Sequence, residues 1–460
     1  MATVVLSGAS AAIPALQISL DLLRHELRRR GDADVRVFDL ASTPLGYCQG
    51  EFDCWVKTPG LCRAHDAEQD IVQAVHDADR HVTVDAVTFG GYSYTVKRAI
   101  DRLICLISPF FEKRMSLTHH EPRYERAASW HALGWQPAPD PSIADTWAAL
   151  ADANALNLLA PHVGATVLDD TSRDAWPRAI GDMLGSDAVP GGTIVDRAAL
   201  REAMRAAAIG ADVGNGHPPR SVALLVGSAK ARGTSLSENL AAAMRERFER
   251  AGATVQTSFA VDFLRDDRAR QTAQAVAAAD LFVLVTPLYI DAIPALPTRA
   301  LTLIAEARRT HTTPARCAAL INCGFPEPEH TRTALAIVRH FSTAARYTWA
   351  GGLPLGGGGA VRPDVPLDQQ HGPAEHVHAA LDLAVGNLMA GQSLSREAIE
   401  QMARSPMPDV LYRLAGDLGW RYQVYKNRLA QADLRARPLD YWITVTRTRH
   451  TRATSRRDDP

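Results

Sequence analysis

Residues 221–240 read Ser-Val-Ala-Leu-Leu-Val-Gly-Ser-Ala-Lys-Ala-Arg-Gly-Thr-Ser-Leu-Ser-Glu-Asn-Leu, and this stretch decides the fold. The short apolar run 222–226 is typical of a buried strand, and Gly227 ends it. A polar loop follows, and from Leu236 onward the apolar residues recur at helical spacing. The stretch therefore predicts a strand, a hydroxyl-rich loop and a helix. Free N–H groups and a partial positive charge at the start of such a helix favour an anion.

The loop in this stretch offers groups that suit a phosphate monoester, namely Ser228, Lys230, Ser235 and Ser237. It contains no Gly-Lys-Ser/Thr, so it is not a Walker A motif. Its glycines also do not form the dinucleotide-binding fingerprint. Two interpretations are open at this point: the loop binds a phosphate, or it only caps its helix.

The same order of strand, polar loop and helix recurs along the whole chain. In the first half, apolar runs predict strands at 3–6, 35–38, 81–84, 129–133 and 165–168. In the second half they predict strands at 222–226, 254–258, 281–285 and 317–321, with a short one near 348–353. Because helical segments separate the strands, each half predicts an α/β fold with a doubly wound parallel sheet. The two halves share one register, which indicates a tandem repeat.

The domain boundaries follow from changes in composition. We expect a first domain over 1–210, a Gly- and Pro-rich linker over 211–220 and a second domain over 221–373. Residues 374–440 are predicted to form a C-terminal helical extension packed on the second domain. The polar, basic segment 441–460 is predicted to be a disordered tail.

Composition excludes several classes of partner. The 460 residues carry a formal net charge of −1, which gives no electrostatic case for nucleic acid or a membrane surface. No signal peptide is recognised, and no apolar run reaches the ~20 residues that a membrane span needs. Six cysteines are too few for a disulfide scaffold, so we expect a reduced, cytoplasmic protein.

Three loops of the second half, at 227–237, 286–290 and 322–327, carry a family resemblance. In this order they resemble the loops of the flavodoxin-like NAD(P)H-dependent FMN reductases, with Lys230 where that family usually has Arg. In a doubly wound sheet the three loops converge at the carboxyl ends of the strands. The resemblance implies that FMN binds here, with its phosphate on the first loop and its ring between the other two. The cofactor-binding residues it implies are Ser228, Lys230, Ser235, Leu236, Ser237, Pro287, Leu288, Tyr289, Ile290, Asn322, Gly324 and Phe325.

The first half resembles the same family but departs from it at two loops. Its cysteine loop, 47–62, and the segment 89–93 are similar to the family pattern. The loop 7–14, however, has no cation and only two hydroxyls for a phosphate. Asp85-Ala86 stands where Thr-Pro is usual, and an aspartate facing a flavin is unfavourable. We therefore interpret the first half as a degenerate copy that has lost or weakened FMN binding.

The cysteine loop leaves three interpretations open. Cys48, Cys54 and Cys62 have the spacing C-x5-C-x7-C, with Glu51 where another cysteine would fall. Three thiolates are one short of an iron–sulfur or zinc site, unless His65 adds a ligand. We favour reduced cysteines in a packed loop and predict no metal; a metal site and a redox dithiol are the alternatives.

The resemblance implies an FMN-dependent NAD(P)H oxidoreductase that passes hydride from a nicotinamide to FMN. A small acceptor then takes the electrons: a quinone, a nitroaromatic, a flavin or a biosynthetic intermediate. No firm catalytic residue is implied, and Tyr289 is a candidate for orienting the substrate. The alternatives are a flavin-binding electron-transfer protein without its own substrate and a non-flavin protein of the same fold.

Members of this family commonly form dimers with the active site at the interface. The two halves of this chain are therefore expected to form an intrachain pseudo-dimer, in which Phe89, Tyr92 or the loop 109–126 covers the flavin of the second half. A homo-oligomer of the whole chain is a further expectation.

Overall fold

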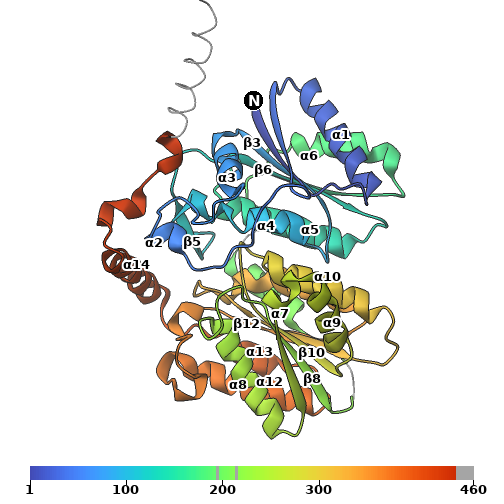
Figure 1. Cartoon of the computed structure of the whole chain (residues 1–460), viewed down its shortest axis with the longest axis vertical. Coiled ribbons are helices and arrows are strands. Elements are labelled where there is room, and N and C mark those ends of the chain that lie inside the picture. The colour runs from blue at the N-terminus through green and yellow to red at the C-terminus, as the bar shows by residue number, and fades with distance from the viewer. Residues whose placement is uncertain (193–195, 213–215, 442–460) are drawn as a thin grey trace, which may run out of the picture.

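Two five-stranded parallel sheets, one from each half of the chain, form the centre of the structure (Figure 1). The computed structural model describes residues 1–192, 196–212 and 216–441. Parts of two predicted segments lie outside these ranges: residues 213–215 of the linker and 442–460 of the tail.

The first sheet has the strand order β2-β1-β3-β6-β7. Its strands are β1 (Ala2–Ser7), β2 (Asp34–Asp39), β3 (Arg80–Ala86), β6 (Ser129–Gln136) and β7 (Val163–Asp169). The helices of this half are α1 (Pro14–Arg29), α2 (Asp53–Val56), α3 (Glu68–Asp77), α4 (Tyr94–Ile100), α5 (Pro141–Asn157) and α6 (Trp176–Leu184). The central strands β1 and β3 are almost wholly buried, as expected for a parallel sheet covered on both faces.

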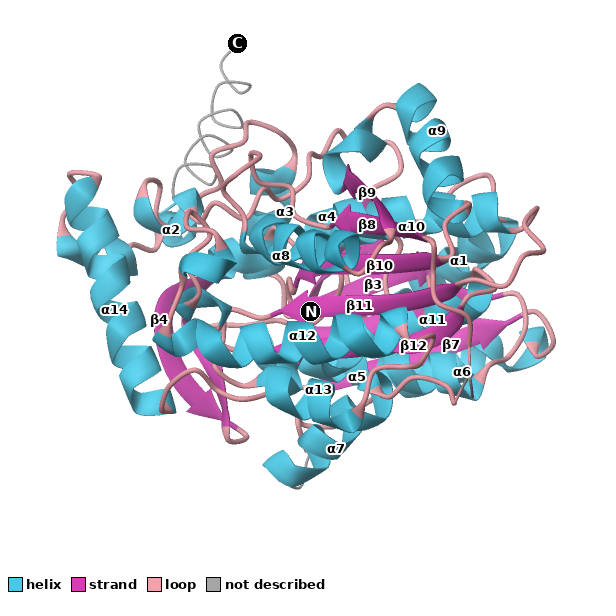
Figure 2. Cartoon of the chain, turned by 90° about the horizontal axis from the view of Figure 1, so that it is seen from below, coloured by secondary structure: helices cyan, strands magenta, loops and turns pink. Residues whose placement is uncertain are grey.

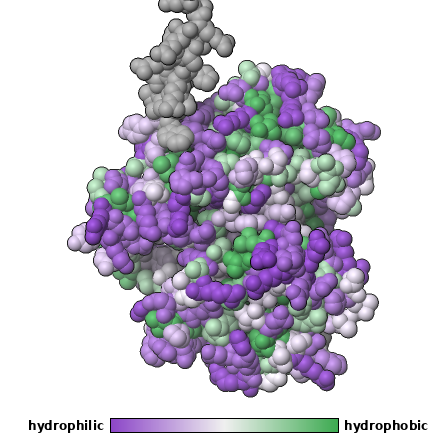
Figure 3. Space-filling view, viewed as in Figure 1, coloured by the Kyte–Doolittle hydropathy of each residue, from purple (hydrophilic) through white to green (hydrophobic). Residues whose placement is uncertain are grey.

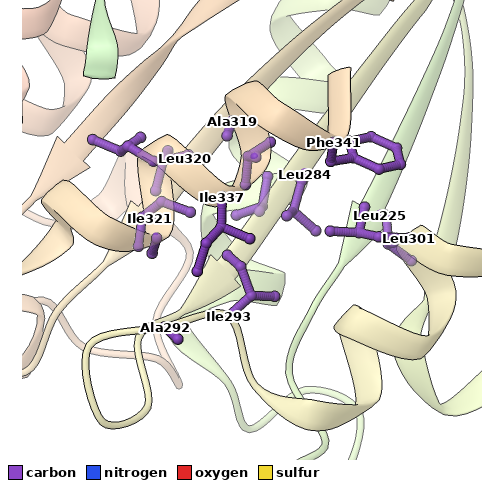
Figure 4. Packing of buried hydrophobic residues seen from close by; sticks show 14 of the residues in the cluster. Leu225, Leu284, Ala292, Ile293, Leu301, Ala319, Leu320, Ile321, Ile337 and Phe341 are labelled. Carbon is purple, nitrogen blue, oxygen red and sulfur yellow. The ribbon is translucent and has the colours of Figure 1, made fainter. Parts of the chain in front are cut away.

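The second sheet repeats this order as β9-β8-β10-β11-β12. Its strands are β8 (Ser221–Val226), β9 (Thr254–Phe259), β10 (Leu281–Pro287), β11 (Arg316–Asn322) and β12 (Thr348–Leu355). Its helices are α8 (Leu236–Arg250), α9 (Asp266–Ala277), α10 (Ala295–Arg308) and α11 (Arg332–Ala344). Leu225, Leu284 and Phe341 belong to the apolar core between this sheet and its helices (Figure 4). The predicted pair of doubly wound, flavodoxin-like sheets is confirmed.

One element of the first half differs from the prediction. The segment expected as the loop 109–126 contains an antiparallel hairpin, β4 (Ile107–Arg114) and β5 (Leu117–Pro122). The two strands are joined at Met115 and Ser116, which both have positive φ. Short hairpin turns of this kind usually carry Asn or Gly, so this turn has no recognisable sequence signal.

Equivalent helices of the two halves pack on each other. α4 packs on α10, and α5 packs on α11. Phe89 lies edge-on to Phe341 across this interface, with ring centroids 5.4 Å apart. The loops that follow β3 and β10 are built alike, since Thr88 bridges Gly91 and Tyr289 bridges Ala292. This arrangement supports the predicted intrachain pseudo-dimer.

The C-terminal region contacts both halves. α12 (Glu375–Met389) and α13 (Arg396–Met402) pack on the second half, as predicted for the extension. α14 (Asp409–Lys426) then crosses to the hairpin of the first half, at the edge of the molecule (Figures 1 and 2). Beyond it, the Arg123 guanidinium donates to the carbonyl oxygens of Leu434 and Ala436 at 3.1 and 2.8 Å. The extension therefore links the two halves instead of packing on the second alone.

α7 (Arg197–Ala208) belongs to the second half in space, although it precedes the predicted domain boundary in the sequence. The sequence places it in the first domain, but it packs on α11 and β12 of the second half. The Trp349 indole N–H donates to the carbonyl oxygen of Ala207 at 3.2 Å. Arg197 and Arg201 both pair with the buried carboxylate of Glu329.

One face of the molecule can be followed in the space-filling view (Figure 3). Hydrophilic residues predominate on the face seen in Figure 3, and hydrophobic residues form small groups there. Across the described part of the chain, no helix is both long enough and apolar enough to cross a bilayer.

Candidate functional site

A cavity of about 790 Å³ lies between the two halves of the chain. The second half contributes the loops that follow β10 and β11, at 288–291 and 323–325. The first half contributes the cysteine loop and the hairpin, and α14 forms a further part of the wall. The cavity thus lies at the carboxyl ends of the strands of the second sheet, where doubly wound folds bind ligands. Its volume is within the range of small-molecule sites.

Five of the residues predicted to surround the flavin ring line this cavity. They are Leu288, Tyr289, Ile290, Gly324 and Phe325. The structure therefore brings the two predicted ring-binding loops together around one space.

Asn322, which was predicted to contact the ring, lies outside the cavity wall. Its side-chain amide donates to the Ser237 hydroxyl at 2.8 Å and to the carbonyl oxygen of Thr286 at 3.0 Å. Asn322 is buried, and neither it nor Pro287 lines the cavity. Asn322 instead ties the ends of β10 and β11 to the first turn of α8, which fixes the three predicted loops relative to one another.

The residues predicted to bind the phosphate do not line this cavity; they are Ser228, Lys230, Ser235, Leu236 and Ser237. Lys230 approaches the cavity wall at Phe52. The Ser228 hydroxyl accepts the backbone N–H of Lys230 at 3.3 Å. Ser235 caps α8, because its hydroxyl accepts the N–H of Glu238 at 3.1 Å. The Glu238 carboxylate accepts the N–H of Gly233 at 2.6 Å, so the loop is held in place by its own helix. Capping uses the acceptor function of Ser235 and leaves its O–H to donate to a ligand.

The surroundings of the Lys230 ammonium indicate that this loop suits an anion. Its ammonium lies 5.8 Å from the ring centroid of Phe52, a residue of the cavity wall. Within the described ranges, no carboxylate lies within ion-pair distance of its Nζ. Burial lowers the pKa of Lys230, and Glu51 opposes this effect only in part. A phosphate at the start of α8 would supply the missing negative charge, so these residues fit the phosphate of FMN.

The first half covers the cavity with a segment that the sequence did not single out for this role. Gly50 of the cysteine loop contacts the Tyr289 hydroxyl so closely that a Cβ there would collide with it. Phe111 and His120 of the hairpin also line the cavity, as the expected cover by 109–126 implies. Phe89 packs on Phe341 instead, and Tyr92 is buried against Trp147 of its own half. The cysteine loop resembles the family pattern, but this resemblance does not predict that the loop lies over the second half.

Further wall residues come from parts of the sequence with no recognised motif. Tyr412 and Trp420 of α14 line the cavity, and the Tyr412 hydroxyl donates to the carbonyl oxygen of Gly324. Asp291 and His330 also line it, with 3.6 Å between the Asp291 carboxylate and His330 Nδ1. The histidine beside it lowers the pKa of Asp291 against the effect of burial. Only the tertiary fold brings these residues to the site.

The thiols of the cysteine loop lie in the wall of the same cavity. Cys48, Cys54 and Cys62 line it, and Cys105 joins them from η1 (Leu103–Leu106). All the cysteines are free. No group of three or more His, Cys, Asp or Glu side chains could hold a metal ion in the part of the chain that the structure describes. The sequence did not connect Cys105 with the other three.

A second cavity, of about 430 Å³, marks the corresponding position in the first half. Gly8, Ser10 and Asp85 line it, together with Arg98 and its counterpart Arg299 from the second half. The Asp85 side chain lies beneath the loop, because a Cβ at Gly8 would be 2.5 Å from its Oδ1. Asp85 is fully buried and one of its oxygens has no hydrogen-bond partner. A carboxyl group thus stands in the first half where Thr286 contacts Gly227 in the second.

Replacement of Asp85 by asparagine is expected to stabilise the protein above neutral pH. Burial raises the pKa of Asp85 to about 7, against the hydrogen bond from the Ser93 N–H at 2.7 Å. The unfolded chain loses this proton near pH ~4, so wild-type stability falls as the pH rises from ~4 to ~7. Asparagine still accepts the Ser93 N–H and carries no charge. We expect a gain of about 2–4 kcal/mol near pH ~8 and little change near pH ~4.

This expectation is checked by urea denaturation of both proteins at the two pH values. Ser93→Ala serves as a comparison, since it removes no titrating group and retains the backbone N–H. An equal effect of Asp85→Asn at both pH values would contradict it.

Comparison with known proteins supports the resemblance seen in the sequence. Residues 1–120 match the family model of the NADPH-dependent FMN reductases. This matched region contains the loop 7–14, the cysteine loop and most of the hairpin. No curated protein was found to match the chain.

Several solved structures resemble parts of the chain. The azoreductase AzrA is 17% identical, with 37% of this chain and 99% of its own covered, at a TM-score of 0.27. An azoreductase from Bacillus anthracis str. Sterne is 16% identical, with 37% and 98% covered, also at 0.27. RosB with a bound intermediate is 12% identical, with 43% and 86% covered, at 0.28. Likenesses this weak carry no argument about function.

The family match therefore carries the conclusion. It confirms the predicted similarity to the NADPH-dependent FMN reductases and, with it, the prediction of an NAD(P)H-dependent flavin oxidoreductase whose cofactors are FMN and NAD(P)H.

Proposed function

We propose that FMN binds to the second half, with its phosphate on the loop 227–237 and its ring in the cavity between the halves. The observation that carries this proposal is Lys230, whose ammonium lies 5.8 Å from the Phe52 ring of the cavity wall and forms no ion pair in the described structure. In the first half the loop 7–14 has no cation of its own and lies over the carboxyl of Asp85. The cations that line its cavity, Arg98 and Arg299, come from α4 and α10. The family match covers residues 1–120, which belong to the first half.

The side chains around the cavity bind and orient the ligands. Ser228 and the capping Ser235 offer hydroxyl groups, and Lys230 offers charge to the phosphate. Tyr289 and Phe325 come from the two loops that would border the ring. The bound flavin supplies the redox chemistry by accepting hydride from a nicotinamide and passing electrons onward.

The walls of the cavity favour a flat, apolar electron acceptor. Phe52, Trp55, Phe325 and Trp420 all line it, and aromatic faces of this kind stack well on planar rings. Trp55 and Phe52 themselves are stacked, with centroids 5.1 Å apart. We therefore propose a quinone or nitroaromatic as the acceptor in preference to a protein partner.

This proposal predicts tight FMN binding and rapid acceptor-dependent oxidation of NADH or NADPH. The purified protein is examined for a flavin absorbance spectrum, titrated with FMN and then assayed with each nicotinamide and a small quinone. Binding with turnover supports the enzyme. Binding without turnover would favour an electron-transfer protein, and no binding would favour a non-flavin protein of this fold.

A homo-oligomer and a cytoplasmic location remain proposals. Large side chains are exposed along one side of α14: Val410, Leu411, Leu414, Leu418, Tyr422 and Tyr425. An exposed apolar stripe of this size often marks a protein interface. The free cysteines agree with a reducing compartment.

A further inference from the structure

Two thiols that are distant in sequence meet in the wall of the cavity. Cys54 lies on the short helix α2 and Cys105 on η1. The Trp55 indole N–H donates to the carbonyl oxygens of Ile107 and Ile104 at 3.1 and 3.4 Å, which fixes α2 against η1. The side chains of Cys54 and Cys105 both line the cavity, and the neighbouring Cys54 thiol raises the pKa of Cys105.

A buried carboxyl group stands behind this pair. Cys105 Sγ donates to Glu68 Oε1 at 3.4 Å, and the second oxygen of Glu68 has no partner. Glu68 is only 2% exposed, and burial raises its pKa to about 7. The nearby cation, Arg102, is bound to Asp66 at 2.6 Å and to Cys62 at 3.2 Å. Glu68 is thus placed to take a proton from Cys105. A cysteine that served only in packing would not need a carboxyl group at this position.

We propose that Cys54 and Cys105 form a redox-active dithiol that reduces small-molecule disulfides, with electrons supplied by the flavin in the same cavity. Cys54 borders the cavity and is half-buried, so it attacks the substrate disulfide first. Cys105 is buried behind it and displaces the second half of the substrate. The electron supply rests on the proposed function, whereas pairing of the two thiols does not depend on it.

The reaction balances in two steps. In the first, the substrate S–S bond and the two protein S–H bonds break, two substrate thiols leave, and a Cys54–Cys105 disulfide forms. Glu68 holds the proton of Cys105 during this exchange and passes it to the leaving thiolate. In the second step, the Cys54–Cys105 disulfide takes up two electrons and two protons, which restores both thiols. Bound FMN, itself reduced by NADH or NADPH, would supply the electrons.

Two of the other thiols, Cys62 and Cys317, suit this role less well. Cys62 Sγ accepts a hydrogen bond from Arg102, and Cys317 lies within β11, away from the cavity. Disulfides in reducing compartments are usually transient and catalytic, which agrees with a pair that is free here. Intramolecular pairing also needs the two residues to be close, and Cys54 and Cys105 meet this requirement.

The first experiment tests the pair without flavin. The full chain is treated with diamide, and disulfides are mapped by mass spectrometry in wild type, Cys54→Ser, Cys105→Ser and the control Cys317→Ser. We expect a Cys54–Cys105 disulfide in wild type and in Cys317→Ser, and none in the other two variants. If wild type forms no such disulfide, or if Cys54 pairs with another cysteine, the proposal is overturned.

The second experiment tests the flow of electrons in the FMN-loaded protein. Reduction of 5,5′-dithiobis(2-nitrobenzoate) by NADPH is compared with reduction of a small quinone. We expect the ratio of disulfide to quinone turnover to fall at least tenfold in Cys54→Ser and in Cys105→Ser, but not in Cys317→Ser. An unchanged ratio refutes the dithiol while leaving the oxidoreductase intact. Absence of quinone turnover in wild type would refute the proposed electron supply instead, and the diamide result would then decide the thiol pairing alone.

Discussion

FMN binding is expected to weaken by at least a hundredfold when Ser228 and Lys230 are both replaced by alanine. Ser228 lies at the carboxyl end of β8, and Lys230 offers an ammonium that has no counter-ion in the described structure. A hydrogen bond to a charged group contributes about 1.5–3 kcal/mol. Loss of two such contacts amounts to ~3 kcal/mol or more, which is over a hundredfold in Kd. Titration of the apoprotein with FMN, followed by flavin fluorescence, measures the change.

Two control variants make this result specific to the second half. Ser10→Ala removes a hydroxyl from the corresponding loop of the first half and is expected to leave the FMN affinity within about twofold, a small fraction of one hydrogen bond. Lys230→Arg keeps the charge and restores the residue usual in the resembled family, so it is expected to bind FMN. Weaker binding in Ser10→Ala than in the double variant would place the flavin in the first half instead.

The sheets could be predicted from the sequence because their strands are buried on both faces. The runs 222–226 and 281–285 are continuously apolar, and Gly227 and Thr286 end them. The hairpin escaped prediction because its turn at Met115 and Ser116 lacks the usual residues. The local sequence pattern therefore predicts the regular strands, but it does not predict a hairpin whose turn lacks the usual residues.

The candidate site could be predicted only on the side formed by one half. Tyr289 and Phe325 follow strands of the second sheet, so fold topology alone brings their loops together. Gly50 and Trp420 reach the same cavity through contacts between segments far apart in the chain. Neither the periodicity nor the spacing of residues predicts such contacts. For the same reason, the sequence does not predict that Cys105 lies near Cys54. The sequence does not show how the first half and α14 pack on the second half.

A buried ion pair at this interface leads to the second large effect. Lys97 and Asp101, on α4 and just after it, pair with each other, and their side chains are 1% and 2% exposed. Lys97 Nζ also donates to the carbonyl oxygen of Tyr289 at 2.7 Å. The second oxygen of Asp101 accepts the N–H of Ala295, the first residue of α10, at 2.8 Å. The pair therefore fixes both the loop that borders the cavity and the helix that follows it.

Replacement of Asp101 by alanine is expected to destabilise the protein by about 3–5 kcal/mol, because Lys97 is then left buried without a counter-ion. Lys97→Met should have a similar effect by isolating Asp101. Burial already raises the pKa of Asp101 against the opposing effect of Lys97, so loss of Lys97 leaves burial unopposed by this cation. Urea denaturation followed by circular dichroism measures the loss.

The double variant Lys97→Met/Asp101→Asn separates the charge from the packing. It buries no charge, and its asparagine still accepts the Ala295 N–H, so we expect it to recover at least half of the lost stability. Thr302→Ala gives a matched control, since Thr302 of α10 is the counterpart of Asp101 and donates only to the carbonyl oxygen of Thr298 in its own helix. It should cost less than about 1 kcal/mol, the net value of an ordinary hydrogen bond. Single variants as stable as wild type would mean that the ion pair does not hold the two halves together, and the position of Tyr289 over the cavity would then depend on the apolar contacts of α4 with α10.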